Sequence, residues 1–184
     1  NTLKVRYEKK FFLQLLGVDY ETFVPSTASE AQKQLGLEQG HYVLFSDVAN
    51  TPIKRRDIAE AIANNMGEKY KLLIMCGVKP DVVPLYINAA DFVLLTSDEE
   101  GSPNIIREAL ALNKRVYSVE VGDVAKQLKG LSNSLIVSRN VLDAVKAILQ
   151  NLECAYTDNT RTKLQRVLDF KYLNENVIDL YENS

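Results

Sequence analysis

The 184-residue sequence is 46% hydrophobic and 25% charged, a composition typical of a globular chain with one substantial core. A net charge of −2 and a pI near 5.6 argue against a nucleic-acid-binding surface, which normally carries a basic stripe. The two cysteines, Cys76 and Cys154, lie far apart and do not form a disulfide framework, so a reducing compartment is expected. No apolar run reaches transmembrane length and no signal-peptide core is present, so we expect a cytoplasmic protein.

Short apolar runs alternate with amphipathic stretches from about residue 42 onward. The apolar runs are hydrophobic nearly throughout, as strands of a parallel sheet covered on both faces are. We predict strands at Tyr42–Phe45, Lys71–Cys76, Phe92–Thr96, Arg115–Val119 and Leu135–Val137. We predict helices at Asp57–Met66, Val82–Ala89, Pro103–Leu112, Asp123–Lys129 and Val141–Leu152.

This alternation predicts an α/β fold with an open, doubly wound parallel sheet and right-handed crossovers. Such sheets bind ligands at the carboxyl ends of their strands. Two flanks fall outside the alternation. The aromatic and aliphatic run Phe11–Leu16 predicts a strand that leads into a linker, and the periodicity of residues 158–182 predicts a C-terminal helical extension.

Residues 97–112, SDEEGSPNIIREALAL, form the most informative segment. An acidic, glycine-containing turn follows the third predicted strand, and a helix is expected directly behind it. We expect Ser102 at the N-cap, where its hydroxyl accepts a spare N–H, and Pro103 at the first helical position. Asn104 and Glu108, four residues apart, share one face of that helix. Free amides at a helix start, beside carboxylates, suit an anionic and hydroxyl-rich ligand such as a sugar phosphate.

Several motifs, in order from Gly17 to about Leu152, resemble the second domain of family 4 glycosyltransferases of the GT-B fold. They are GVDYETFVP, AQKQLGL, YVLF with a basic cluster downstream, KLLIMCG, PLYINAADFVLLTSDEEGSPNIIREALALNKRV and VGDV. The AAD…S…EG…E-AL…V string is the most specific part, because strand, turn and helix all match. In that family GVD…F.P follows an N-terminal acceptor-binding domain. The resemblance therefore implies the C-terminal, donor-binding half of a larger, retaining enzyme with a Rossmann-like fold.

On this resemblance we expect an interdomain remnant at residues 1–24, a nucleotide-sugar-binding domain at residues 25–155 and C-terminal helices at residues 156–184. The implied reaction transfers a sugar from a UDP- or GDP-sugar to a glycan or lipid-linked acceptor, as in polysaccharide or lipopolysaccharide synthesis. The acceptor would bind the N-terminal domain, so this domain alone is expected to be inactive. The resemblance implies no metal and no other cofactor, and it allows peripheral association with the cytoplasmic face of a membrane.

The resemblance also assigns roles to individual residues. The family's E-x₇-E pair becomes Glu100, near the donor sugar, and Glu108, on the ribose hydroxyls. The family's diphosphate-binding lysine becomes Lys54, with Arg55 or Arg56 as a second cation, or Arg56 as the principal one. A fixed cation suits the departure of a nucleoside diphosphate, because negative charge builds on the leaving oxygen. We expect Lys54, Glu100 and Glu108 to gather, with Gly77, at the carboxyl edge of the sheet.

The other donor-site candidates are Gly101, Ser102, Asn104 and Ile105, through amides facing the sugar or diphosphate, and Gly77, Val78 and Val83, near the base. The sequence departs from the family pattern at several places. The family commonly has an arginine several residues before the lysine, which this sequence lacks, and the segment between Gly77 and Pro84 is unusually short. Arg55 follows Lys54 where the family commonly has glycine. Ser102 stands where an aromatic residue often follows Glu-Gly. Gly122-Asp123 replaces the usual Gly-Gly near the end of the next strand.

Plainer interpretations compete at several of these positions. The acidic run Asp98–Glu100 could hold a metal, although three adjacent acids at a strand end are more often a solvated turn. Residues 54–56 are by default an exposed basic run. Glu108 could simply be exposed, as we expect its neighbour Arg107 to be, but its apolar neighbours indicate a buried face on which an acid needs a partner.

Two further side chains are of types common in catalysis, but their positions do not favour such a role. Cys76 is expected to be a buried strand-end thiol. His41, the only histidine, precedes the first strand and is therefore expected at the amino edge of the sheet, away from the cleft.

Three other functions remain open. A nucleotide-sugar 2-epimerase shares the GT-B architecture but would be expected to use a histidine that the sequence does not place at the cleft. A receiver-type signalling domain would need an acidic pair after its first strand and an aspartate after its third. Asp47 and Thr96 stand at these positions and fit poorly. A dinucleotide-binding domain is weaker still, because no G-x-G-x-x-G opens a helix.

Overall fold

The computed structural model describes residues 16–47, 51–155 and 159–182. A five-stranded sheet forms its centre, in the order β2-β1-β3-β4-β5, with every neighbouring pair parallel. The strands are β1 (His41–Ser46), β2 (Tyr70–Met75), β3 (Phe92–Leu95), β4 (Arg115–Ser118) and β5 (Leu135–Ile136). The predicted strands are confirmed, each within one residue at either end.

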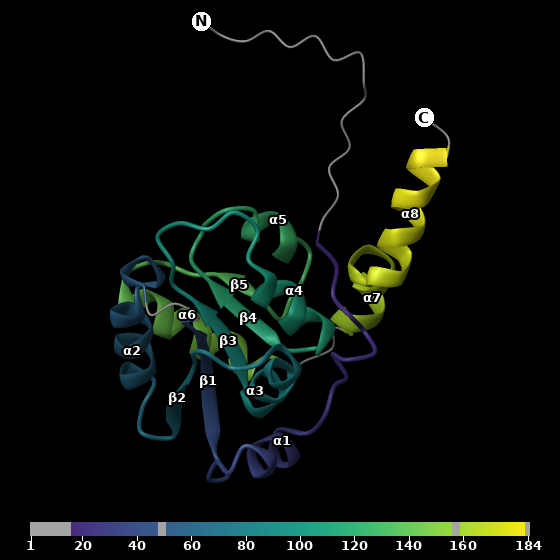
Figure 1. Cartoon of the computed structure of the whole chain (residues 1–184). Coiled ribbons are helices and arrows are strands. Elements are labelled where there is room, and N and C mark those ends of the chain that lie inside the picture. Colours follow the sequence, from purple (N-terminus) through teal and green to yellow (C-terminus); the bar gives the residue numbers. More distant parts are fainter. Residues whose placement is uncertain (1–15, 48–50, 156–158, 183–184) are drawn as a thin grey trace, which may run out of the picture.

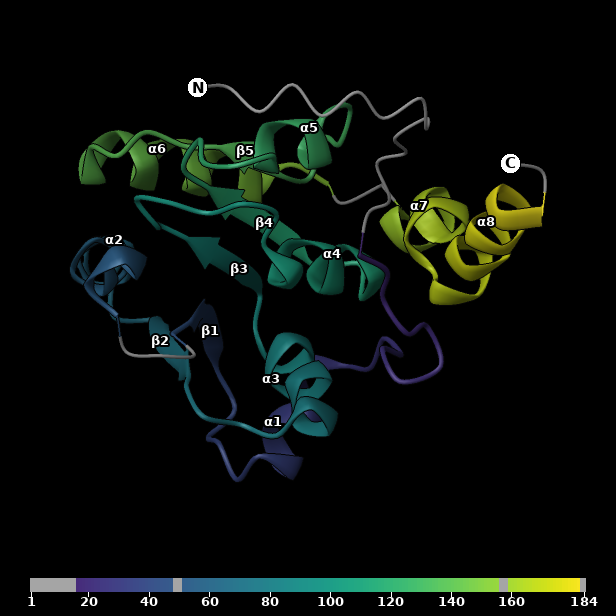
Figure 2. The same cartoon turned by 45° about the horizontal axis from the view of Figure 1, so that its top comes forward.

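Helices cover both faces of the sheet, as Figures 1 and 2 show. The helices are α1 (Ala28–Gln34), α2 (Arg56–Asn65), α3 (Val83–Ala89), α4 (Asn104–Ala111), α5 (Val124–Leu128), α6 (Val141–Glu153), α7 (Thr160–Leu168) and α8 (Phe170–Glu182), with 3₁₀ turns η1 (Pro52–Lys54) and η2 (Pro80–Val82). Alternate strand residues point to opposite faces. Leu44 and Val93 face α3, α4 and α5, whereas Val43 and Phe45 face α2 and α6. The doubly wound α/β fold is confirmed.

Helix α1 is an element that the strand-helix alternation did not predict. Its start carries a capping box, in which the Thr27 hydroxyl accepts from the Glu30 amide while the Glu30 carboxylate accepts from the Thr27 amide. Thr-x-x-Glu is a sequence signature of a helix start, so this helix could have been found. The expected C-terminal helical stretch is present as two helices, α7 and α8, which meet at Asp169.

The segment around Gly17 packs against the junction of α7 and α8. Val18 donates to the Leu168 carbonyl at 2.6 Å, and Phe170 donates back to the Val18 carbonyl at 3.1 Å. A Cβ on Gly17 would lie 2.7 Å from the Phe170 ring and 3.1 Å from the Leu168 carbonyl oxygen, so a side chain here would force its neighbours to shift. The predicted strand at Phe11–Leu16 lies almost wholly outside the described residues, and the predicted domain boundaries stay predictions.

Within the described residues, no helix is both long enough and apolar enough to cross a membrane.

Candidate functional site

The strand order places a topological switch point between the carboxyl ends of β1 and β3. The helix after β1, α2, covers one face of the sheet, whereas the helix after β3, α4, covers the other. At such a switch point the two connections diverge and leave an opening for a ligand. The loops that carry Lys54 and Glu100 both start at this opening.

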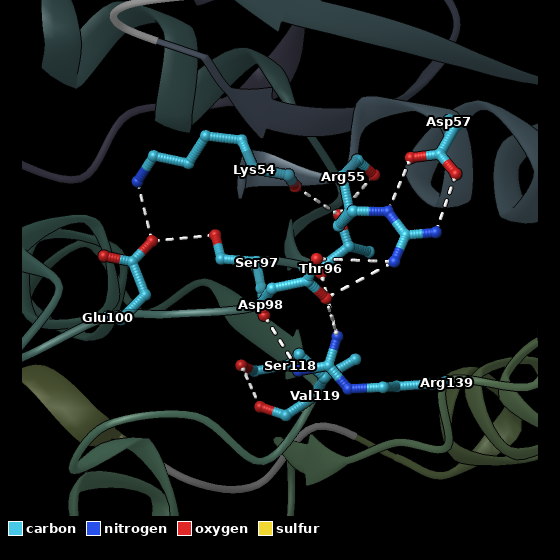
Figure 3. Close-up of polar contacts among 10 residues, drawn as sticks. All are labelled: Lys54, Arg55, Asp57, Thr96, Ser97, Asp98, Glu100, Ser118, Val119 and Arg139. Atoms are coloured by element: carbon cyan, nitrogen blue, oxygen red, sulfur yellow. Dashed lines mark hydrogen bonds and ion pairs between the residues drawn. The ribbon is translucent and has the colours of Figure 1, made fainter. Parts of the chain in front are cut away.

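Lys54 and Glu100 form an ion pair between the loop after β1 and the loop after β3. Lys54 Nζ lies 2.6 Å from Glu100 Oε1, and the Ser97 hydroxyl donates to the same oxygen at 2.7 Å (Figure 3). The side chains of Lys54 and Glu100 are only 24% and 13% exposed. The structure therefore brings together the two residues that were predicted to be catalytic.

Thr96, which is fully buried, fastens the Lys54 loop to the end of β3. Its hydroxyl lies 2.9 Å from the Lys54 carbonyl oxygen and 3.0 Å from that of Arg55 (Figure 3). The Asp98 amide donates to the Ile53 carbonyl at 2.8 Å. Arg55 itself has φ of +53°, a left-handed conformation in which glycine is the usual residue. Arg55 thus has a backbone conformation typical of glycine, at the position where the family that the sequence resembles commonly has glycine.

Two arginines converge on Asp98 beside this pair (Figure 3). Arg55 makes a two-pronged contact with Asp57, at 3.0 and 2.9 Å, and its Nη1 lies 3.3 Å from Asp98. Arg139 lies 2.9 Å from Asp98 and donates to the Ser97 carbonyl at 3.0 Å. The bond to Asp57 raises the pKa of Arg55 and, together with the nearby Asp98, keeps it charged.

Sequence reasoning missed Arg139. It lies just after β5, at the same carboxyl edge of the sheet, and a basic residue at a strand end was the signal available. Arg56, by contrast, points along α2 and pairs with Glu60 at 2.8 Å, both side chains being exposed. The structure therefore separates Arg56 from the Lys54–Glu100 pair.

A hollow of about 600 Å³ opens beside these loops. Its lining residues are Asp47, Thr51, Pro52, Ile53, Arg55, Arg56, Asp57 and Asp98. The acidic run does not converge as a metal site would, because the Asp98 carboxylate binds arginines and the Glu100 carboxylate binds Lys54. Among the described residues, no three His, Cys, Asp or Glu side chains are grouped so that they could hold a metal ion.

The predicted helix start after Glu100 is wrong by one residue. Pro103 is the N-cap and α4 begins at Asn104, without a side-chain cap. The Ser102 hydroxyl instead donates to Asp123 Oδ2 at 2.7 Å, so it does not accept a helix amide. Gly101 is exposed, while the Ile105 side chain is buried in the core, which leaves only its backbone available to a ligand.

The expectation that Arg107 is exposed is also wrong, since only 1% of it is accessible. Its guanidinium turns back toward the start of α4, where it donates to the Ser102 hydroxyl at 2.6 Å and to Asn104 Oδ1 at 2.5 Å. No sequence pattern indicates this burial. Arg107 is buried because its guanidinium bonds to Ser102 in the turn before the helix.

Among the described residues Glu108 makes no hydrogen bond or ion pair with Lys54 or Glu100, and its expected gathering with them stays a prediction. It is half-buried and borders a second hollow, of about 180 Å³, beside α4. The lining residues of that hollow are Gly17, Val18, Asp19, Phe23, Asn104, Arg107, Glu108 and Phe170. Burial raises the pKa of Glu108, and the nearby Arg107 charge opposes that rise. Within the described residues no side chain forms an ion pair or hydrogen bond with its carboxylate.

The remaining candidates follow β2 at the edge of the sheet. Gly77 is exposed with φ of +63°, and Val78 and Val83 are partly buried against the core. Cys76 is exposed, so the predicted buried thiol is wrong: β2 is an edge strand and ends one residue earlier. His41 starts β1 and contacts Asp91 at 2.9 Å, at the amino edge as predicted.

At the sequence level, no protein-family model and no curated protein matches the chain. Solved structures do. Sucrose-phosphate synthase from Thermosynechococcus elongatus aligns with a TM-score of 0.76 at 17% identity, over 94% of this chain and 52% of that one. Anabaena HepE, solved with UDP and glucose, aligns with a TM-score of 0.72 at 16% identity, over 93% of this chain and 56% of that one. The chain thus spans about half the length of these two proteins.

A third structure decides which half is matched. It is the C-terminal domain of a group 1 family glycosyl transferase, LpcC, from Francisella tularensis, and it aligns over 84% of this chain and 100% of its own length. Its TM-score is 0.65 at 12% identity. The chain has the fold of a GT-B C-terminal domain. At these identities the similarity establishes the fold, while the site residues stay predictions.

Proposed function

We propose that this chain is the donor-binding domain of a retaining glycosyltransferase that uses a nucleoside-diphosphate sugar. The observation that carries the proposal is the Lys54–Glu100 pair at the switch point between β1 and β3. At this switch point the cation suits the diphosphate of such a donor, and the carboxylate beside it suits the sugar hydroxyls. The fold is that of the C-terminal domain of a group 1 glycosyl transferase, and HepE, which aligns with the same chain, was solved with UDP and glucose.

In the proposed reaction Lys54 contacts the donor diphosphate. Negative charge builds on the leaving phosphate oxygen as the glycosidic bond breaks, and a preorganised cation stabilises that charge. Loss of one such group typically lowers the rate by about 10²–10³-fold. Glu100, which Ser97 holds in place, accepts hydrogen bonds from the sugar hydroxyls once Lys54 turns to the diphosphate. The left-handed Arg55, at the family's glycine position, supports Lys54 rather than Arg56 as the principal cation.

Glu108 is proposed to accept hydrogen bonds from the ribose hydroxyls. Gly77, Val78 and Val83 are proposed to lie near the base. A half-buried carboxylate beside a hollow, without a partner among the described side chains, is suited to an incoming hydroxyl. The amides of Gly101, Ser102, Asn104 and Ile105 are proposed to face the sugar or the diphosphate. No metal or other cofactor is required in this scheme, because Lys54 supplies the charge.

The acceptor, a glycan or a lipid-linked sugar, is proposed to bind a domain equivalent to the other half of the larger structures. A nucleotide-sugar epimerase is the rival with the same architecture. His41 does not supply its histidine, because it lies at the amino edge of the sheet.

Thermal-shift titration of the 184-residue chain against UDP, GDP, ADP and CDP tests the proposal. A specific ligand stabilises by about 2.7 kcal/mol at a hundredfold excess over its Kd. We expect UDP or GDP to raise the melting temperature and the other two to leave it unchanged. No shift with any of the four would contradict a donor site. Epimerisation of a UDP-sugar without acceptor would favour the rival.

A further inference from the structure

The turn at Ser102 is joined to the turn after β4 by a chain of side-chain hydrogen bonds. The Ser102 hydroxyl donates to Asp123 Oδ2 at 2.7 Å and accepts from Arg107 Nη1 at 2.6 Å. Asp123 Oδ1 in turn accepts from Gln127 Nε2 at 2.6 Å. We call Ser102, Arg107 and Asp123 the clamp. It joins the loop between Glu100 and Asn104, the donor loop, to helices α4 and α5.

The two backbones also touch beneath the clamp. The Asp123 amide donates to the Gly101 carbonyl at 3.1 Å. Gly122 has φ of +53°, and a Cβ there would lie 2.3 Å from the Gly101 oxygen and 2.7 Å from that of Glu100. Only glycine permits this approach. The donor loop is therefore fixed by both backbone and side chains.

Arg107 is the member of the clamp whose burial lowers the stability of the fold. It is buried, yet no carboxylate among the described residues lies within ion-pair distance of it, and its Nε has no hydrogen-bond partner. A buried charge without a direct partner lowers stability, and burial lowers the pKa of Arg107 accordingly. Its charge lies against the start of α4, where the helix dipole opposes a cation and favours an anion. The nearby charges of Asp123 and Glu108 oppose part of this cost, and an anion bound at the start of α4 would reduce it further.

The clamp coincides with two of the sequence departures. Ser102 stands where the related family often has an aromatic residue, and Asp123 stands where it has a second glycine. These two residues, 21 positions apart, bind each other directly. The departures are therefore one structural feature rather than two.

We propose that Ser102, Arg107 and Asp123 are positioning residues, which hold the donor loop against the diphosphate and place the Arg107 charge behind its amides. This inference rests on the proposed function. The loop after β1 has no arginine before Lys54 at the described positions, and in this proposal Arg107 supplies a further positive charge to the donor loop. Binding of a diphosphate, rather than of a nucleoside, is the step that the clamp serves.

Calorimetric titration of the 184-residue chain with UDP, GDP, uridine and guanosine tests this. Arg107→Met removes the charge and puts an unbranched apolar side chain in its place. Because a well-packed apolar residue often replaces a buried charge without loss of stability, we expect the melting temperature not to fall. We expect diphosphate affinity to fall about tenfold while nucleoside affinity is unchanged. Arg107→Lys, which keeps the charge without the fork, should recover part of that loss. Arg166→Met, an exposed arginine on α7, is the matched control and should change neither affinity.

Ser102→Ala and Asp123→Asn test the clamp should Arg107→Met fail to fold, since Ser102 is exposed and Asp123 partly exposed. Each should weaken diphosphate binding selectively, and the double variant should bind about as weakly as the weaker single variant. Variants that bind diphosphate like the wild type, or that lose nucleoside and diphosphate affinity equally, would overturn the clamp and leave the proposed function standing. A wild-type chain that binds neither UDP nor GDP would remove both.

Discussion

Lys54 Nζ lies 2.6 Å from Glu100 Oε1, although the two residues are 46 positions apart in the sequence. The contact joins the loop after β1 to the loop after β3, which are the two loops that flank the switch point of the sheet. The two side chains are mostly buried. Their charges therefore interact with each other, and with an incoming ligand, more strongly than the charges of an exposed pair would.

Replacement of Lys54 should separate phosphate binding from nucleoside binding. We expect Lys54→Met to weaken UDP or GDP binding by about 1.5–3 kcal/mol, the range for hydrogen bonds to charged groups. Uridine or guanosine affinity should not change, because the contact is to phosphate oxygens. Calorimetry measures both. Arg56→Met, which removes the exposed partner of Glu60, should leave both affinities as they are, and a loss there instead would move the cation to Arg56.

Glu108 should lower the stability of the free protein at neutral pH. Its pKa in the folded state is raised by burial, so the folded state binds the proton more tightly than the unfolded state. The resulting stability is present below the unfolded-state pKa and is lost as pH rises through the folded-state pKa. Glu108→Gln, which cannot ionise, should therefore raise the melting temperature at pH 7 and have little effect at pH 3.5.

The exposed neighbour Glu99 offers the control, and Glu99→Gln should not change stability at either pH. Glu108→Gln should at the same time weaken nucleoside diphosphate binding by about 1.5–3 kcal/mol if the carboxylate binds ribose. Gained stability together with unchanged binding would show that Glu108 is buried without serving the donor.

Gly122 should be intolerant of any side chain. Gly122→Ala adds a Cβ 2.3 Å from the Gly101 oxygen, and we expect unfolding free energy to fall by about 2–4 kcal/mol. Gly36 also has a left-handed φ, +68°, but nothing lies within 4 Å of the Cβ position. Gly36→Ala should cost only about 1 kcal/mol for its backbone. Equal losses in urea denaturation would mean that the close approach contributes nothing.

Thr96 should stabilise the Lys54 loop through its hydroxyl. Thr96→Val keeps the side-chain shape but leaves the partly buried carbonyls of Lys54 and Arg55 without this donor, which should lower the unfolding free energy by about 1–3 kcal/mol in urea denaturation. Diphosphate affinity should fall with it, because the loop that carries Lys54 is released. Thr162→Val, an exposed threonine on α7, should be neutral.

Hydrophobic patterning alone was enough to predict the five strands, the five helices around them and the doubly wound sheet. A parallel strand buried on both faces must be apolar almost throughout, and its helix must alternate with it along the chain. That the loops of Lys54 and Glu100 share one edge also followed from the sequence, because carboxyl ends of parallel strands meet there. The α1 helix was signalled by Thr27 and Glu30 but was not predicted from periodicity, since it lies outside the alternation.

Tertiary structure decided which charges meet. The burial of Arg107, the pairing of Ser102 with Asp123 and the arrival of Arg139 at Asp98 depend on how the loops after β3, β4 and β5 fold over one another. Such loop contacts join residues of any type at any sequence separation, so they produce no periodic pattern in the sequence. Local pattern determined the frame, because burial against a sheet repeats along each element. The side-chain network at its edge followed only from packing in three dimensions.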